Sequence, residues 1–135
     1  MSGLLIVANR LNANAALKVK VPVAKQFMVV APQATPAPYL LISQVSGSDG
    51  VHLDGQDEYP RERIQVDVVA TSYTEARAII DLVKAALRNI IKSTISSVGV
   101  KDVDVIHTGM EITDYNDDRT AVILITDFMV RWRKQ

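Results

Sequence analysis

The two histidines are the residues best suited to act as a catalytic base or a metal ligand near neutral pH. His52 and His107 are distant in the sequence, and neither has a second ligand at the spacing of a zinc site. No serine lies in a nucleophile elbow, and Gly47-Ser48-Asp49-Gly50 lacks the lysine and helix of a phosphate-binding loop. We therefore expect both histidines to be ordinary loop or strand residues. We expect no catalytic residue, no cofactor and no enzymatic activity.

A third pattern resembles a calcium-binding loop and fails at defined positions. Asp114, Asn116 and Asp118 have the spacing of the first, third and fifth ligands. Arg119 stands where the loop needs glycine, and Ile125 stands where it needs a bidentate glutamate. We therefore expect no metal site.

Three aromatic residues are candidates for contacts with partners. Trp132 lies between Arg131 and Arg133 and could stack on a nucleic-acid base. A lone aromatic at a strand end is more often a core or rim residue, and we favour that role. Tyr59 and Tyr115 lie in polar segments, where they would either anchor an interface or pack onto their own domain.

Composition sets broad limits on the class of protein. The chain has 135 residues, 48% of them hydrophobic and 22% charged, which is typical of one globular domain. It has no cysteine, which excludes disulfides and fits a reducing compartment. Fifteen basic and fifteen acidic residues cancel, which argues against a dedicated nucleic-acid binder. The apolar run 4–8 is too short to cross a membrane, so we expect a protein that is cytoplasmic at synthesis and makes no membrane contact.

The charges are unevenly distributed along the chain. No acidic residue precedes Asp49, and the acids gather in 49–67 and 102–118. Basic residues stand at the two ends of the chain, at Arg10, Lys18, Lys20, Lys25, Arg131, Arg133 and Lys134. Such blocks usually mark solvated faces. The alternative is a self-complementary surface, in which basic ends of one copy meet acidic loops of the next and build a ring.

Apolar periodicity predicts the elements of the first half. A short helix is expected at about 3–17, then an extended, edge or irregular segment at 19–30. The proline-rich segment 31–38 predicts a loop, and 39–45 predicts a central strand. The polar segment 46–59 is a long connection of a kind that is often functional or disordered.

The strongest signal in the chain is a strand that leads directly into a capped helix. Residues 61–70 alternate, with Ile64, Val66, Val68 and Ala70 on the inward face. Ser72 is the expected N-cap, and Glu75 stands where it can complete a capping box. The buried stripe of this helix is formed by Ala76, Ile79, Ile80, Val83, Leu87 and Ile90.

The last third predicts a loop at 93–99, a strand at about 103–113, a turn at 114–119 and a strand at 120–133. The expected fold is α+β, within a single domain spanning 1–135. A mostly antiparallel sheet of about four strands packs against a long capped helix, about 73–92, and a short N-terminal helix.

The order of these landmarks resembles the tail-terminator proteins of long-tailed bacteriophages, also called tail-completion or head–tail joining proteins. The resemblance covers roughly 28–133. Its landmarks are Ala31-Pro32-Gln33, Pro38-Tyr39, Leu53-Asp54-Gly55, Arg63-Ile64-Gln65-Val66-Asp67, Tyr73-Thr74-Glu75-Ala76-Arg77, Asp114-Tyr115 and the cluster around Trp132. Residues 18–27 depart from the family pattern, so another neck or tail protein of similar fold stays open as an alternative.

The resemblance implies a structural protein of the virion at the head–tail junction, assembled in the host cytoplasm. It implies a homo-oligomer, a hexameric ring, that caps the tail tube, stops its polymerisation and offers a joining surface to the head. The implied partners are the major tail-tube protein and the head-completion or connector protein, and DNA passes through the lumen without sequence recognition. A small non-enzymatic adaptor or binding module remains an alternative, and an enzyme or nucleotide-binding domain is the third.

Two polar segments are the candidate contacts with neighbouring subunits or the tube. They are 46–59 and 114–119. The candidate interface residues within them are Asp49, His52, Leu53, Asp54, Asp57, Tyr59, Tyr115, Asp117, Asp118 and Arg119.

Overall fold

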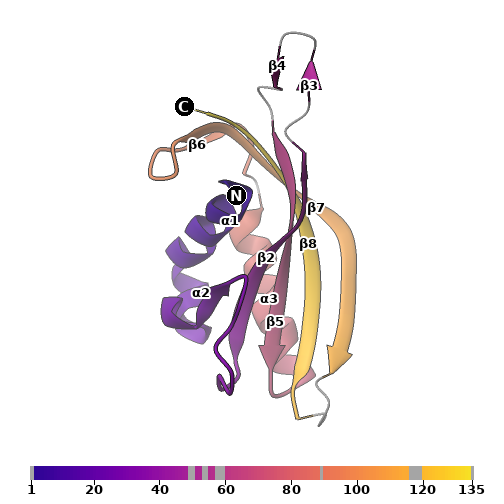
Figure 1. The fold of residues 1–135 in the computed structure, drawn as a ribbon. Coiled ribbons are helices and arrows are strands. Elements are labelled where there is room, and N and C mark those ends of the chain that lie inside the picture. The colour runs from indigo at the N-terminus through magenta and orange to yellow at the C-terminus, as the bar shows by residue number, and fades with distance from the viewer. Residues whose placement is uncertain are drawn as a thin grey trace.

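The computed structural model describes residues 2–48, 51–52, 55–56, 60–88, 90–115 and 120–134. It is an α+β structure in which three helices lie on one face of a curled six-stranded sheet (Figure 1). The helices are α1 (Ser2–Ala13), α2 (Ala15–Lys20) and α3 (Tyr73–Leu87), with a 3-10 turn, η1, at Val23–Lys25. The strands of the sheet are β1 (Gln26–Met28), β2 (Tyr39–Ser48), β5 (Arg61–Ala70), β6 (Ser93–Ile95), β7 (Val100–Tyr115) and β8 (Val122–Lys134).

The sheet is mixed and has six strands, whereas the prediction was a mostly antiparallel sheet of about four. Its order is β1-β2-β5-β8-β7-β6; β1 runs parallel to β2 and every other pair is antiparallel. A separate two-stranded ribbon joins β3 (Val51–His52) to β4 (Gly55–Gln56). The prediction gave 19–30 only as extended, edge or irregular structure, and it missed β6, because three residues are too few to show a period-two pattern. It took 46–59 and 93–99 for loops, whereas β2 continues to Ser48 and β6 lies within 93–99.

The unit formed by β5 and α3 matches its prediction closely. Residues 61–70 form β5, and Ile64, Val66, Val68 and Ala70 are fully buried under the helices. The Ser72 hydroxyl accepts a hydrogen bond from the Glu75 backbone N–H at 3.2 Å, as an N-cap should. The reciprocal half of the capping box is absent among the described residues, where Glu75 Oε1 has no hydrogen-bond partner.

Helix α3 ends at Leu87, five residues before the predicted end. Arg88 has extended backbone angles, so the helix cannot continue through it. Ile90 is still buried, and its carbonyl accepts a hydrogen bond from the Val105 N–H at 3.0 Å. The apolar stripe continued to Ile90 because the core needs an apolar side chain there, whether or not the backbone is helical.

The N-terminal segment forms two helices where one was predicted. The break lies at Asn14, whose side-chain Oδ1 accepts from the Leu17 N–H at 2.9 Å and caps α2. Asparagine competes for backbone donors in this way, which disfavours helix interiors and favours caps. Leu11 and Leu17 on either side are both buried, so the break redirects the chain without leaving the core.

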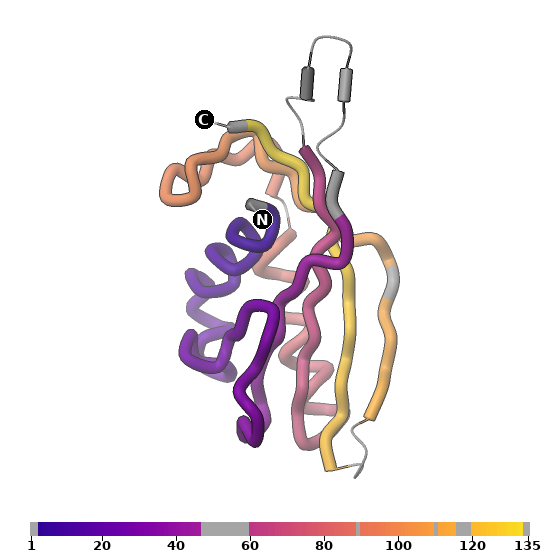
Figure 2. The backbone as a smooth tube through the Cα atoms, viewed as in Figure 1, coloured from indigo at the N-terminus to yellow at the C-terminus, as the bar shows by residue number. Residues whose placement is uncertain are grey.

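The core fills the space between the three helices and the sheet. Trp132 was predicted to be a core or rim residue, and it is buried in the core. Strands β7 and β8 begin and end within a few residues of the predicted bounds and form a long, curved antiparallel pair (Figure 2). The proline-rich segment 31–38 is a loop, as predicted.

Candidate assembly interface

Most of β7 forms an edge of the sheet in the described part of the chain. Strand β6 pairs with β7 at Val100 and Val103, and the Ile90 carbonyl accepts a hydrogen bond from the Val105 N–H. Beyond Val105, β8 is the only strand that pairs with β7 among the described residues. The register between β7 and β8 shifts twice, between Lys101 and Asp104 and between His107 and Glu111. Gly109 lies in the second bulge with φ of 85°, a conformation that glycine adopts without strain. The bulges add curvature to an edge strand that is sixteen residues long.

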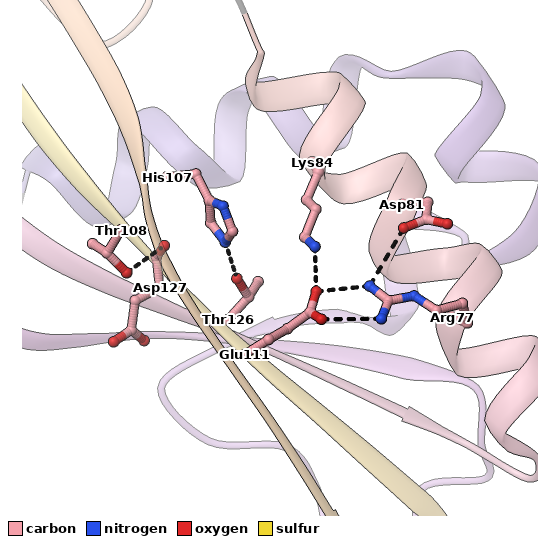
Figure 3. Close-up of polar contacts among 8 residues, drawn as sticks. All are labelled: Arg77, Asp81, Lys84, His107, Thr108, Glu111, Thr126 and Asp127. Carbon is pink, nitrogen blue, oxygen red and sulfur yellow. Dashed lines mark hydrogen bonds and ion pairs between the residues drawn. The ribbon is translucent and has the colours of Figure 1, made fainter.

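Helix α3 clamps this edge through Glu111 (Figure 3). Arg77 donates from Nη1 to Oε2 at 3.0 Å and from Nη2 to Oε1 at 2.7 Å, and Lys84 Nζ also contacts Oε1. Arg77 also pairs with Asp81 one helical turn later, at 3.4 Å. The hydrogen bonds from Arg77 and Lys84 lower the pKa of Glu111 from 4.5 to about 2. The two cations and two carboxylates balance, so this cluster has no net charge.

A second set of contacts holds β7 against β8. His107 Nε2 lies 2.6 Å from the Thr126 hydroxyl, and the imidazole ring lies 5.2 Å from the ring of Phe128. The Thr108 hydroxyl donates to the Asp127 carbonyl at 3.3 Å. His107 is therefore a strand residue held by its neighbours, as the sequence predicted. It also lines a groove of about 450 Å³ between α3 and β7, together with Arg88, Ile91 and other residues.

The sheet face opposite the helices carries a buried polar group. Asp127 is almost fully buried there, and Arg63 Nε donates to its Oδ2 at 2.7 Å. Burial raises the pKa of nearby Asp67, and the charge of Asp127 raises it further, while a hydrogen bond from Gln65 opposes the rise. This face is therefore mixed in polarity, and the exposed large apolar side chains of the sheet lie mainly at its two edges.

Exposed apolar residues gather along the β7 edge. Ile106 and Ile112 lie on the helix-free face, where they pair with Met129 and Ile125, and they are 59% and 46% exposed. Tyr115 ends the strand and is 55% exposed. Among the predicted interface residues, Tyr115 is the one whose side chain the structure describes, and it lies on the surface.

The other predicted interface residues fall largely outside the described part. His52 lies in β3, but its side chain is not among those described. The remaining predicted residues lie outside the described ranges, at Asp49, Leu53, Asp54, Asp57, Tyr59, Asp117, Asp118 and Arg119.

The described strand residues next to the two candidate segments nevertheless show where each segment leaves the sheet. Segment 46–59 connects to the end where Ser48 pairs with Arg61. Segment 114–119 leaves from the opposite end, where Tyr115 and Ala70 both pair with Val122 (Figure 1). The ten residues of β5 span this distance, roughly 30 Å at the rise of a strand. The structure therefore does not bring the two segments together into one site.

A set of exposed residues that sequence reasoning missed lies at the opposite edge of the sheet. Val19, Val23, Met28, Val29 and Val30 are all exposed, on and around α2, η1 and β1. The run of three apolar residues at 28–30 was the available signal. It was read only as extended or edge structure, because its exposure depends on β1 having no outer neighbour in the described chain.

Two further findings concern the described residues alone. They contain no cluster of three or more metal-ligating side chains. None of their helices has the length and apolar character needed to cross a membrane.

Comparison with known proteins identifies the family. The family model of tail completion protein gp17 matches residues 7–109, more than half of the chain. A chain from the virion of a native gene transfer agent particle has a similar fold, with a TM-score of 0.70 at 15% identity. The match covers 94% of this chain and 91% of that one. Curated proteins give no significant sequence match. The chain therefore belongs to the tail completion protein gp17 family, structural proteins of the phage tail within the virion.

Proposed function

We propose that this protein is the tail terminator of a long-tailed phage. Six copies close into a ring on the last ring of tube subunits, stop tube polymerisation and present a joining surface to the head connector. The role is structural and non-catalytic, and DNA passes through the lumen without sequence recognition. Family membership supports the general role. The ring of six, the tube contact and the head contact are what the resemblance to tail-terminator proteins implies, and the arrangement of the described elements is compatible with them.

The observation that carries the proposal is the placement of the two candidate segments at opposite ends of one sheet. A terminator must contact two different partners, the tube on one side and the connector on the other. Segment 46–59 leaves the sheet beside Ser48 and Arg61, and segment 114–119 leaves it beside Tyr115 and Val122. If the strands run roughly along the ring axis, one segment faces each partner. The sheet edges are then left for contacts between copies.

Both segments have a composition suited to polar recognition at a surface. Segment 46–59 contains Asp49, Asp54, Asp57 and other polar residues around Leu53 and Tyr59. Aromatic residues surrounded by polar residues are typical of the central contacts of interfaces. We propose that the candidate residues in this segment contact one axial partner, and that Tyr115, Asp117, Asp118 and Arg119 contact the other.

The test separates the two ends of the sheet. One variant lacks residues 48–57, and the second carries Tyr115→Ala with Asp117→Ala and Asp118→Ala. A control variant carries Asp81→Asn, because Asp81 is an exposed residue of α3 that is far from either segment in the sequence. Each variant is mixed with tail tubes and then with heads, and negative-stain microscopy scores tube length, caps at tube ends and joined particles.

We expect one variant to leave tubes uncapped and of uncontrolled length. The other should give capped tubes of normal length that do not join heads. The control should behave as wild type. The proposal fails if both variants cap tubes and join heads normally. A wild-type protein that stays monomeric and ignores tube ends would instead favour the adaptor module.

A further inference from the structure

The two edges of the sheet carry exposed patches that differ in charge. The β1 edge patch consists of the exposed side chains of Val19, Val23, Met28, Val29 and Val30 together with Lys18, Lys20 and Lys25. Val19 is 84% exposed, the largest value among the exposed apolar residues of the described chain. The three lysines make no ion pair with any described residue. The patch is thus apolar with a net positive charge.

The backbone of the β1 edge patch is held in a strained conformation. Val29 has φ of 69°, which is unfavourable for a β-branched residue. Its N–H donates to the Ile42 carbonyl at 2.8 Å, and the Val30 N–H donates to the Met28 carbonyl at 2.8 Å. This tight turn ends β1 and leaves Val29 and Val30 in solvent. Strain of this kind persists where the surrounding structure requires it, and it is frequent at functional surfaces.

The β7 edge patch consists of Ile106, Ile112, Asp114 and Tyr115. All four are exposed, and Asp114 lies on the helix-free face beside Ile112. Glu111 is neutralised by Arg77 and Lys84 within the chain. Asp114, by contrast, accepts one hydrogen bond in the described structure, from the backbone N–H of Tyr115. The patch is thus apolar with a net negative charge.

The two patches lie on opposite edges of one sheet. Three strands, β2, β5 and β8, separate β1 from β7, and Figure 2 shows the two edges on opposite sides of the molecule. At the usual spacing between strands the edges are about 19 Å apart. Two different, complementary patches on opposite sides of one chain can join copies head to tail. A patch that joined copies by a two-fold axis would have to complement itself.

We propose that the β1 edge patch of one copy packs against the β7 edge patch of the next, and that this is the lateral contact of the ring. The inference rests on the proposed ring and names its interface. Apolar contact buries Val19, Val30, Ile106 and Ile112, and the lysines of one copy face Asp114 of its neighbour. Complementary charge steers copies into this orientation and disfavours like-to-like pairing.

Two blocked variants test the contact. The β1-blocked chain carries Val19→Glu and Val30→Glu, and the β7-blocked chain carries Ile106→Gln and Ile112→Gln, so the two altered edges have no opposite charges that could join them to each other. Every substituted side chain is exposed, so folding should survive, and circular dichroism checks it. Leu5→Lys on α1 is the control, because Leu5 has the same exposed fraction as Ile112, 46%, and belongs to neither patch. Light scattering measures the mass of each variant in solution, and negative-stain microscopy scores rings on tube ends.

Each blocked chain alone should have the mass of a monomer where wild type and the Leu5→Lys control form rings. An equimolar mixture of the two should give a dimer, twice the monomer mass. One chain still has an intact β7 edge and the other an intact β1 edge, so a single contact can form. The inference is overturned if either blocked chain still forms rings, or if the mixture stays monomeric.

A crosslinking measurement does not depend on weakening the contact. The chain has no cysteine, so Val30→Cys and Ile112→Cys introduce the only thiols. With a short bismaleimide, the chain with both cysteines should give a ladder of covalent oligomers, and each single-cysteine chain should give no covalent oligomer. Efficient crosslinking of a single-cysteine chain to itself would overturn the head-to-tail contact. Wild type that forms no ring, alone or on tubes, would instead refute the proposed function on which this contact depends.

Discussion

Replacing Glu111 with glutamine should weaken the attachment of the β7 edge to α3 and make the stability of the protein less dependent on pH. The carboxylate receives two hydrogen bonds from Arg77 and a contact from Lys84, across 34 and 27 residues of sequence. Glutamine keeps the size and shape of the side chain but not its charge. It therefore removes the charge-assisted part of the clamp and leaves the packing in place.

The magnitude follows from the pKa of Glu111 and its exposure. A fall from 4.5 to about 2 corresponds to at most about 3 kcal/mol of stability at neutral pH. The side chains of Glu111 and Arg77 are 30% and 32% exposed, so solvent screens much of this attraction. Ion pairs of that exposure contribute up to about 1 kcal/mol each. We expect the substitution to lower the free energy of unfolding by about 1 kcal/mol at pH 7.

The pH dependence has a definite sign. The pKa of Glu111 is lower in the folded protein than in the unfolded chain, so its contribution is complete above about pH 4.5. That contribution is lost as the pH falls towards 2, because protonated glutamate resembles glutamine. The difference between wild type and Glu111→Gln should therefore be largest at pH 7 and shrink towards zero near pH 2.

Urea unfolding at pH 7, 4 and 2.5, followed by circular dichroism on dilute protein, measures this difference. Asp81→Asn is the control, because Asp81 pairs with the same arginine at 3.4 Å but is 63% exposed. It should cost no more than about 0.5 kcal/mol, the value typical of exposed helix pairs. The reasoning is refuted if Glu111→Gln matches the control at pH 7, or if its cost stays constant down to pH 2.5.

Three other substitutions probe the packing and the backbone. Gly3→Ala should lower the free energy of unfolding by about 1–3 kcal/mol, because a Cβ there would lie 2.7 Å from Glu62 Oε2 and 3.0 Å from Glu62 Cβ. A lower midpoint of thermal unfolding measures this loss, and the double variant Gly3→Ala with Glu62→Ala should recover part of it. Ile80→Ala should cost about 2–5 kcal/mol in urea unfolding, since Ile80 is fully buried in the core, and a cost below 1 kcal/mol would contradict that burial. Gly109→Ala should cost about 1 kcal/mol through its φ of 85° alone, because no atom of the described residues beyond its chain neighbours lies within 4 Å of the added Cβ. A much larger loss in the same assay would mean that the bulge is packed.

Local patterns in the sequence predicted the parts of the fold that depend on local burial. The alternation over 61–70 and the stripe from Ala76 to Leu87 record which side chains face the core, and that information lies within a few residues. The Ser72 cap and the buried Trp132 were predicted for the same reason. The failure of each catalytic and metal template could be judged locally too, because such sites need defined residue types at defined spacing.

The ends of elements depended on contacts between distant residues. The stripe that suggested a helix to about 92 includes Ile90, but Ile90 lies beyond the helix, and its backbone carbonyl accepts a hydrogen bond from the Val105 N–H of β7. Asn14 interrupts the predicted first helix because its side chain caps the next one. In both places the sequence correctly indicated burial, and the backbone path was decided by partners that periodicity does not specify.

The sequence alone determined an α+β chain with the β5–α3 unit at its centre, with no catalytic site expected and with the polar segments 46–59 and 114–119 as candidate contacts. Only the tertiary structure decided that those segments leave opposite ends of the sheet, and that apolar patches of opposite charge lie on its two edges. The physical reason is that exposure at an edge, and position along a sheet, depend on which strands pair and in what register. Those pairings join residues far apart in the chain, so no local pattern records them.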